Sequence, residues 1–414
     1  MNVLFVCEYE WFKSVVFDIH VLSEGLSLLG HQVYAIDYEW DDKSQVRFKT
    51  VEVRGAIRVY PEARVILRRP GFVRIRLRRP AFAKLLLLEY LSTVLTHYLE
   101  IGKVLQDRHI DVIVLYSVLT NGLPAVRWAR KFGIPVVFRN IDMLHKLSPN
   151  PMKRLATKFF EKRVYPKMDA VLALTPKYAE YLKHLGADES KVRLLLFPID
   201  TKLFHPGIDC SEIRQRWGLT EKDQVIVLVG TLYRFSGLNE FIRQFQGITQ
   251  QLPEAKLLIV GDGPLRLEME RTIAELGLEG RVIITGYQAF QTMPQYINLA
   301  MVCINVYPIT SVTKDLFSAK IIQYLACGKS TVSTSLPGIT TLIRGESCGV
   351  VYVDSVASMV IEVVHLLKSP ERREQLGQAG LDYVMQEHSY EKIVPQFETI
   401  LEEVVREKRR KTRT

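Results

Sequence analysis

Two stretches of the second half decide the fold: Val225-Ile226-Val227-Leu228-Val229-Gly230 and Leu257-Leu258-Ile259-Val260-Gly261-Asp262-Gly263-Pro264. Each is a continuous run of aliphatic and β-branched residues that stops at a glycine. A short run with no polar face is typical of a strand buried in a parallel sheet. A glycine directly after the run permits the tight turn into a following helix. The two stretches therefore predict a parallel sheet whose strands are connected by helices.

The same alternation continues through the rest of the second half. Strands are predicted over Gln224–Val229, Lys256–Val260, Arg281–Thr285, Met301–Val306, Ser330–Thr334 and Gly349–Tyr352. Helices are predicted over Leu238–Leu252, Pro264–Leu276, Thr292–Leu299, Phe317–Ala326, Ile339–Ile343, Val356–Leu367 and Pro370–Glu387. Strands that alternate with helices in this way indicate a doubly wound α/β domain.

The first half repeats the pattern. Strands are predicted over Asn2–Cys7, Gln32–Ile36, Asp111–Tyr116, Ile134–Phe138, Ala170–Leu174 and Val192–Leu196. Phe17–Leu29 has apolar residues at helical spacing, and Gly30 follows it as a C-cap. Thr175 before Pro176 is typical of the N-cap of a helix over Lys177–Gly186.

Length and punctuation divide the chain. A chain of 414 residues exceeds what one hydrophobic core usually serves. Pro198, Pro206 and Gly207 interrupt the pattern after the first six strands and indicate a linker. We predict two tandem Rossmann-like domains, 1–200 and 201–385, a helix over 386–405 that crosses back to the first domain, and a disordered basic tail over 406–414.

The composition, 48% hydrophobic and 24% charged, is typical of a globular protein. Five cysteines without paired spacing argue against a disulfide framework and against a zinc site, and favour a reducing cytoplasm. The first residues enter an apolar run without a basic leader, so no signal peptide is expected. The apolar stretch 81–105 contains too many charged residues for a spanning helix.

The net charge of +10 is unevenly distributed. Between Arg64 and Lys84, basic residues alternate with aliphatic and aromatic ones, a pattern that suits an anionic membrane surface at the cytoplasmic face. Nucleic acid is the competing anionic partner, and a solvated edge with a loop is the third interpretation. Of these, we expect the membrane surface rather than nucleic acid.

Three loops of the second half have the form of anion-binding turns, because loops after parallel strands present amide groups and helix N-termini. They are 230–237, 261–264 and the polar segment 309–318, which leads into a helix carrying Lys320 and Gln323 one turn apart. Each loop alone is also explained as ordinary punctuation after a strand, and the helix as one with solvated polar positions. Together they favour a site for a phosphate and a ribose.

In order along the chain, these loops and several further segments resemble the retaining GT-B glycosyltransferases of the large family-4 group, also called glycosyl transferases group 1. The matching segments are Gly30-His31-Gln32-Val33, Asp169-Ala170-Val171 with Thr175, Ile199-Asp200-Thr201-Lys202-Leu203-Phe204-His205-Pro206, the Gly230 loop, Val260-Gly261-Asp262-Gly263-Pro264, Arg281-Val282 through Gly286-Tyr287, and Gln323-Tyr324-Leu325-Ala326-Cys327-Gly328-Lys329. The resemblance covers nearly the whole chain. It implies a cleft between the two domains, no metal and no cofactor, with a UDP- or GDP-linked sugar as donor.

The resemblance also implies a donor site in the second domain. Its residues would be Gly230, Thr231, Arg234, Ser236, Gly237, Gly261, Gly263, Tyr287, Leu316, Phe317, Ser318, Lys320 and Gln323. The family's usual pair of glutamates is replaced by Asp315 and Gln323, and its usual clamp cations by Thr231 and Ser236. Arg234 and Lys320 are the cations expected to reach the diphosphate instead.

On the acceptor side, the family's glycine-rich loop is replaced by a segment with aromatic residues. The residues expected to contact acceptor are Tyr9, Trp11, Ser14, Asn140 and His145. Trp11 is equally well explained as a packing residue, and His145 as an ordinary loop histidine. Asp142 matches the family's carboxylate after this strand, and we expect Asp142 and Asp315 to be catalytic, orienting acceptor and donor hydroxyls.

The resulting hypothesis is a retaining glycosyltransferase that moves a sugar from a nucleotide diphosphate sugar to a hydroxyl acceptor, with a lipid-linked or polysaccharide precursor favoured by the basic segment. The departures from the family pattern leave two alternatives. One is a GT-B subunit with weakened turnover that acts as a binding or scaffold partner. The other is a sugar-nucleotide epimerase built on the same two-domain plan.

Overall fold

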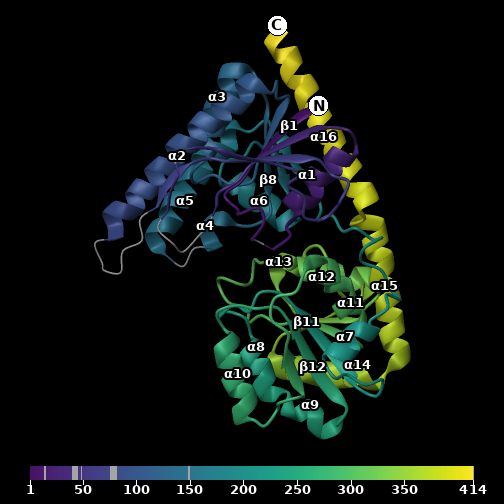
Figure 1. The fold of residues 1–414 in the computed structure, drawn as a ribbon. Helices are drawn as coiled ribbons and strands as arrows, with labels where there is room; N and C mark the ends of the chain where they lie inside the picture. The colour runs from purple at the N-terminus through teal and green to yellow at the C-terminus, as the bar shows by residue number, and fades with distance from the viewer. Residues whose placement is uncertain (14, 40–44, 48, 75–81, 148–149, 414) are drawn as a thin grey trace. The chain divides into compact units, whose positions relative to one another are not determined.

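The computed structural model describes residues 1–13, 15–39, 45–47, 49–74, 82–147 and 150–413. The chain divides into two compact units, shown in Figure 1. Unit 1 comprises Met1–Leu196 together with Ile393–Thr414, and unit 2 comprises Phe197–Lys392. Each unit is built around one mostly parallel sheet.

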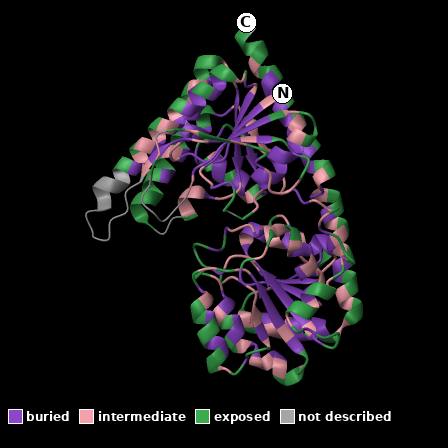
Figure 2. Cartoon of the chain, in the orientation of Figure 1, coloured by how far each residue is buried: buried purple, intermediate pink, exposed green. Residues whose placement is uncertain are grey.

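Unit 1 contains an eight-stranded sheet in the order β10-β9-β8-β7-β1-β2-β5-β4. Its strands are β1 (Asn2–Val6), β2 (Gln32–Ile36), β4 (Val51–Arg54), β5 (Val65–Arg69), β7 (Val112–Leu115), β8 (Val136–Asn140), β9 (Ala170–Ala173) and β10 (Val192–Leu194). All pairs are parallel except β4 with β5, which is antiparallel. The central strands are buried along their length, as Figure 2 shows, which explains why they lack alternating polarity.

Helices cover the sheet of unit 1. They are α1 (Asp18–Leu28), α2 (Phe82–Asp107), α3 (Gly122–Phe132), α4 (Leu144–Leu147), α5 (Pro151–Val164), η1 (Tyr165–Lys167), α6 (Pro176–His184), η2 (Glu189–Lys191) and most of α16 (Tyr390–Arg413). The predicted signals at two helix ends are confirmed. Gly30 has φ 90°, and the Thr175 hydroxyl accepts a hydrogen bond from the Tyr178 amide at 3.2 Å.

The edge of this sheet was not predicted. Part of the basic segment from Arg64 to Lys84 forms strand β5, and its next strand, β6 (Phe72–Arg74), pairs with β3 (Gln45–Arg47) in a separate two-stranded ribbon. Arg68 is ion-paired with Glu100 and Glu52, and Arg69 with Glu10 and Asp37. For Arg68 and Arg69 the membrane interpretation is therefore wrong, because both side chains are largely buried and neutralised inside unit 1. Residues 75–81 of the segment lie outside the described residues.

Helix α2 contains most of the apolar stretch 81–105 and has an inverted polarity. The polar residues Glu89, Thr93, His97 and Glu100 are buried, whereas Leu88, Leu91, Leu95 and Leu99 are exposed. Buried partners explain the inward polar face: the Glu89 carboxylate accepts from the Tyr38 hydroxyl at 2.7 Å, and Glu100 pairs with Arg68. Within the described ranges, no helix is long and apolar enough to cross a bilayer.

Unit 2 contains a six-stranded parallel sheet in the order β13-β12-β11-β14-β15-β16. Its strands are β11 (Gln224–Val229), β12 (Ala255–Val260), β13 (Val282–Ile284), β14 (Val302–Asn305), β15 (Thr331–Thr334) and β16 (Val350–Val353). Its helices are α7 (Ser211–Arg216), α8 (Leu238–Gln244), α9 (Gln246–Gln251), α10 (Arg266–Glu275), η3 (Phe290–Thr292), α11 (Met293–Asn298), α12 (Ala319–Ala326), α13 (Pro337–Thr340), η4 (Gly345–Cys348), α14 (Val356–Lys368) and α15 (Pro370–Glu387). One apolar cluster packs on each face of the sheet.

The second-half predictions differ from unit 2 mainly at helix ends. The single helix predicted over Leu238–Leu252 is divided into α8 and α9 at Phe245. Helix α10 begins at Arg266 rather than Pro264, because the Gly263 carbonyl and the Leu232 backbone hold the preceding residues in a turn. The order of strands follows the prediction in every case.

The basic tail 406–414 was predicted to be disordered, and this is wrong for residues 406–413, which continue helix α16. The reason is local charge compensation on unit 1. Lys408 pairs with Asp169 at 2.9 Å, and Arg409 pairs with Asp111 at 2.5 Å. Upstream in the same helix, Val394, Phe397 and Leu401 are buried in the core of unit 1.

Candidate active site

The two glycine turns of unit 2 touch through their backbones. Gly230 follows β11 with φ 135°, and Gly261 follows β12 with φ 155°, a region that side chains rarely adopt. A Cβ atom on Gly261 would overlap the Gly230 carbonyl oxygen. One on Gly263 would lie 2.7 Å from the Leu232 amide nitrogen. Glycine at these positions is therefore required by the contact between the turns.

Hydrogen bonds keep the two turns in register beyond the ends of their strands. The Gly230 amide donates to the Val260 carbonyl at 2.9 Å, and the Leu232 amide donates to the Asp262 carbonyl at 3.0 Å. Gly261 also forms a bridge with Gly286, which places Tyr287, an exposed residue, at the neighbouring strand end. The result is a stretch of closely packed backbone, formed by glycines, at the carboxyl edge of the sheet.

Lys320 brings a cation to this surface. Its Nζ would lie 3.0 Å from a Cβ on Gly230, and it lies 5.3 Å from the centre of the Tyr307 ring. Lys320 is partly buried, and no carboxylate pairs with it in the described part of the chain. An amine held against bare backbone without a protein counter-ion can bind an anion.

The first turn also carries an aromatic column. The rings of Tyr233 and Phe235 stack with centroids 4.8 Å apart, and Phe235 stacks on Tyr307 at 6.3 Å. Lys320 lies at the far end of this column. The Tyr307 ring stabilises the Lys320 ammonium, because a cation over an aromatic face is attracted by the ring.

The remaining donor candidates of the first turn and of α12 make contacts within the protein that do not test donor binding. Arg234 is exposed and lies 4.0 Å from Glu268, a weak surface pair. The Ser236 hydroxyl donates to the Tyr233 carbonyl at 2.6 Å. Thr231 and Gln323 are partly buried, and Gly237 is packed against Val306. Their predicted contacts with a donor stay predictions.

The segment before α12 presents the start of that helix. Ser318 occupies the N-cap position, but its hydroxyl donates to Asn305 at 2.8 Å instead of capping the helix. The first-turn amides are thus left without a side-chain cap, which favours an anion there. Leu316 and Phe317 are partly buried, and Asp315 is buried where its backbone contacts Gly338. The predicted catalytic role of Asp315 remains a prediction.

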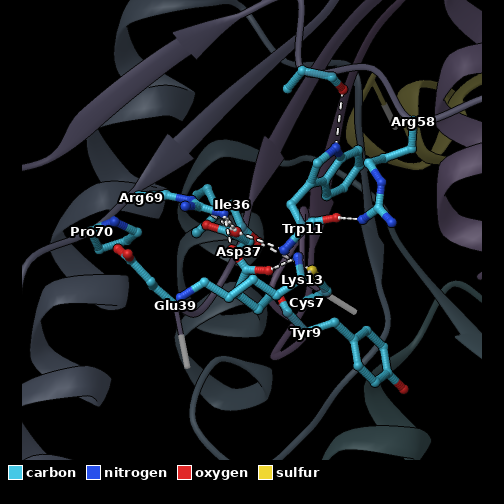
Figure 3. Close-up of polar contacts among 12 residues, drawn as sticks. Cys7, Tyr9, Trp11, Lys13, Ile36, Asp37, Glu39, Arg58, Arg69 and Pro70 are labelled. Atoms are coloured by element: carbon cyan, nitrogen blue, oxygen red, sulfur yellow. Dashed lines mark hydrogen bonds and ion pairs between the residues drawn. The ribbon is translucent and has the colours of Figure 1, made fainter. Parts of the chain in front are cut away.

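In unit 1, the loop after β1 is held by charges, as Figure 3 shows. Asp37 at the end of β2 accepts hydrogen bonds from the Trp11 amide at 3.0 Å and from Arg69 at 2.8 Å. Arg69 also pairs with Glu10 at 2.6 Å. Arg58 donates to the Trp11 carbonyl. Burial raises the pKa of Asp37 to about 6, against the opposing effect of Arg69.

This network corrects part of the acceptor prediction. Trp11 is buried, with its indole N–H donating to the Ala56 carbonyl at 3.0 Å and its ring edge-on to His20, so the structure places it in the core. The apolar ring gains more from burial than from exposure once its N–H has a partner. Tyr9 points away from the network in Figure 3 and packs on Phe17. Ser14 lies outside the described residues.

His145 is also engaged by the protein itself. Its Nδ1 lies 2.6 Å from the Glu161 carboxylate, and its ring stacks on Tyr181 with centroids 5.5 Å apart. These contacts link α4 to α5, and the predicted acceptor contact of His145 stays a prediction. Asn140 is buried, and its amide donates to the Asp142 carbonyl at 2.6 Å, which fixes the turn that presents Asp142.

Asp142 lies near the carboxylate of Asp18 at the carboxyl edge of the sheet. Burial and the neighbouring Asp18 raise its pKa to about 7. Glu8, after β1, accepts hydrogen bonds from the amide and hydroxyl of Thr120, and burial raises its pKa as well. A carboxyl that ionises near neutrality is suited to accept a proton from a hydroxyl group.

A buried ion pair supports this edge. Arg139 at the end of β8 and Asp18 at the start of α1 are both fully buried and lie 2.7 Å apart. Arg139 also donates to the carbonyl of Leu195 at 2.5 Å. In the described residues, no group of three or more His, Cys, Asp or Glu side chains is arranged to hold a metal ion.

Sequence reasoning missed three features. The Asp18–Arg139 pair joins residues 121 positions apart, so no local signal marks it. Glu8 directly precedes Tyr9 in the aromatic segment after the first strand, but a single carboxylate in a loop carries no signal of its own. The aromatic column has a partial signal, since Tyr233 and Phe235 alternate within a glycine-bounded turn, but Tyr307 comes from a distant strand end.

Comparison with known families gives two matches. The family described as "Glycosyl transferases group 1" matches residues 223–369. The "Glycosyl transferase 4-like domain" family matches residues 18–197. Together, the two matches fall on both units and cover most of the chain.

Individual relatives are distant. N-acetyl-alpha-D-glucosaminyl L-malate synthase of Bacillus anthracis is 24% identical over 241 residues, which are 58% of this chain and 61% of the relative. The chain thus spans about three fifths of the length of the curated relatives it matches.

Solved structures match over nearly the full chain. Sucrose-phosphate synthase of Thermosynechococcus elongatus has a TM-score of 0.72 at 17% identity, covering 97% of this chain and 98% of the other. HepE of Anabaena, in complex with UDP and glucose, has a TM-score of 0.68 at 16% identity, covering 97% and 99%. At such identities the likeness concerns the fold alone, and the predicted α/β fold with two parallel sheets is confirmed.

Proposed function

This chain belongs to the group 1 glycosyltransferases, and we propose that it transfers a sugar from a nucleotide diphosphate sugar to a hydroxyl acceptor. The single observation that carries the proposal is the anion site of unit 2. There Lys320 lies against the backbone of Gly230, whose turn is packed on the turn of Gly261. Bare amides, an uncapped helix start and one lysine without a carboxylate partner suit the diphosphate of a sugar donor.

The proposed chemistry follows from what the transferred bond requires. As the bond from the sugar to the diphosphate breaks, negative charge develops on the leaving oxygen and the sugar acquires oxocarbenium character. Lys320 and the α12 amides stabilise that charge. The acceptor oxygen forms the new bond to the anomeric carbon as the diphosphate leaves. Asp142 accepts the proton of that hydroxyl or orients it, and Asp315 orients donor hydroxyls. Retention of the anomeric configuration is part of the proposal.

A uridine nucleotide is the first donor to test, supported by the UDP bound in the related fold of HepE. A GDP-linked sugar is the other candidate. For the acceptor we propose a lipid-linked saccharide or a polysaccharide precursor. A cytoplasmic location, peripheral to the membrane, belongs to the same proposal.

Donor binding is tested by thermal shift and calorimetry with UDP, GDP and their common sugar conjugates. One of these should raise the melting temperature of the wild-type protein at saturating concentration. Lys320→Ala should bind that nucleotide about tenfold to a hundredfold more weakly, because a hydrogen bond to a charged group is lost. Lys222→Ala removes the same charge at the opposite end of β11 and serves as the matched control.

Two results would overturn the donor assignment: no nucleotide shifts the melting temperature, or Lys320→Ala binds like Lys222→Ala. A transfer assay with the identified donor then separates the three functional hypotheses. A transferase forms product only with an acceptor, and an epimerase converts the donor alone. A binding subunit does neither while still showing the thermal shift.

A further inference from the structure

Helix α5 (Pro151–Val164) exposes a stripe of large apolar side chains. Met152 is 80% exposed, Leu155 69% and Phe159 50%. At 3.6 residues per turn these positions fall within roughly 60° of arc on one face of the helix. Single exposed apolar residues are ordinary on a protein surface, but three aligned ones on a helix mark a face that contacts something apolar.

Contacts on the buried face of α5 prevent the helix from rotating to turn this stripe inward. Glu161 is buried there, where its carboxylate contacts His145 at 2.6 Å and accepts from the Tyr165 hydroxyl at 3.0 Å. The Tyr181 hydroxyl donates to the same carboxylate. Thr157 and Val164 are buried beside it. The side chain of Asn150 caps the helix start, accepting from the Met152 amide at 2.9 Å. The orientation of the helix is therefore fixed by hydrogen bonds.

The charges around the stripe have one sign. Lys153, Arg154, Lys158, Lys162 and Arg163 are exposed on α5, and the only carboxylate of the helix is the buried Glu161. Lys158 and Lys162 flank the stripe on one side, and the Arg163 guanidinium lies over the Phe159 ring at 4.2 Å. An apolar centre with a basic border has the form of a helix that lies in the interface of an anionic bilayer.

The competing occupants fit less well. Nucleic acid would meet apolar side chains at the centre of the face, where phosphates need cations. A second copy of the chain docked through the same face would bring two sets of cations together. An anionic lipid surface offers acyl chains to the apolar centre and negatively charged headgroups to the basic border.

We propose that α5 docks unit 1 on anionic phospholipid, with Met152, Leu155 and Phe159 inserted among the acyl chains and the lysines at the headgroups. This deepens the proposed function, on which it rests for its biological purpose, since a lipid-linked acceptor is presented at such a surface. Arg68 and Arg69, which are ion-paired inside unit 1, are not part of this contact. The positive charge of Lys153 partly opposes the rise that burial causes in the pKa of Glu8, which is consistent with α5 lying close to the acceptor edge.

Flotation with vesicles tests the proposal. Wild-type protein should bind vesicles of equal parts phosphatidylglycerol and phosphatidylcholine, and bind pure phosphatidylcholine far less. The triple variant Met152→Gln, Leu155→Gln, Phe159→Gln should lose binding by about a hundredfold. Lys158→Gln with Lys162→Gln should weaken it about 30-fold. The control is Leu267→Gln with Ile361→Gln in unit 2, where the side chains are 70% and 71% exposed, and it should bind like wild type.

The proposal is overturned if wild type ignores anionic vesicles, or if the triple variant still floats with them. It is also overturned if duplex DNA binds more tightly than the vesicles and competes with them, or if the triple variant only changes the oligomeric state. Circular dichroism and hydrogen exchange of unit 1 peptides, measured on the same samples, report whether the variant is folded, and the nucleotide thermal shift is recorded beside them. That shift belongs to unit 2, so its absence in wild type would count against the proposed function and not against α5.

Discussion

The candidate site edges of unit 1 and unit 2 differ in what holds them together. In unit 2, the turns after β11 and β12 meet backbone to backbone, and glycine makes the contact possible. In unit 1, the ends of β2, β5 and β8 carry Asp37, Arg69 and Arg139, which are buried and paired with charges from distant segments. The unit 2 edge consists of backbone packed closely at glycines, and the unit 1 edge of buried charges that compensate one another.

This difference predicts what each edge tolerates. The unit 2 edge should keep its fold when charge or pH changes, but not when a single carbon atom is added. The unit 1 edge should tolerate changes in volume but not the loss of one member of an ion pair, because the other member is left buried without compensation. Three experiments test that contrast.

The largest effect is expected from Arg139→Met in unit 1. Removing the guanidinium leaves Asp18 buried and unpaired and frees the Leu195 carbonyl. We expect a loss of about 3–5 kcal/mol of folding free energy. Hydrogen exchange measured by mass spectrometry should show the loss in unit 1 peptides. The control Arg193→Met breaks a partly exposed pair with Glu403 and should cost less than about 1 kcal/mol. Equal costs for the two variants would contradict the role assigned to burial.

Gly261→Ala should produce the next largest effect, in unit 2. The added carbon would overlap the Gly230 carbonyl, at a φ of 155° that alanine does not readily adopt. We expect a cost of about 3 kcal/mol and loss of nucleotide binding. Gly277→Ala, at φ 62° with nothing near its Cβ, should cost about 1 kcal/mol and bind nucleotide normally. If both variants bind alike, the two turns are not the donor site.

The smallest effect is a pH dependence carried by Asp142. Its folded pKa of about 7 lies above its ordinary value of 3.8, so the folded state retains a proton that the unfolded state releases. Stability conferred by the protonated form is present below pH 4 and is lost as pH rises toward 7, by at most about 1.4 kcal/mol per pH unit. Asp142→Asn should remove this slope. Urea denaturation of both proteins at pH 5 and pH 8 measures it, and parallel curves would refute the raised pKa.

The same contrast explains what sequence could and could not predict. In unit 2, strand, glycine and helix start are consecutive in the chain, so the order of strands and the turns at Gly230 and Gly261 were predicted from local pattern. The helix ends were less accurate. Helix α10 starts late because Leu232, from the other turn, holds residues 263–265, and no local signal encodes such a contact.

In unit 1, the decisive partners are far apart in sequence. The alternating basic segment was interpreted as a surface pattern, yet Arg68 and Arg69 find carboxylates on four other segments and become part of the core. For Trp11, an aromatic ring suited to a sugar face and a packing residue were equal interpretations, and its burial with the N–H donating to the Ala56 carbonyl favours packing. Compensation of this kind becomes visible only in three dimensions.

Helix α16 begins in unit 2 with Tyr390 to Lys392 and supplies unit 1 with the buried side chains of Val394, Phe397 and Leu401. Unit 1 is therefore discontinuous along the chain. During synthesis its strands leave the ribosome first, but the last part of its core arrives only after the whole of unit 2 has been translated. Until then, the surface that Val394, Phe397 and Leu401 cover has no partner from the C-terminal helix.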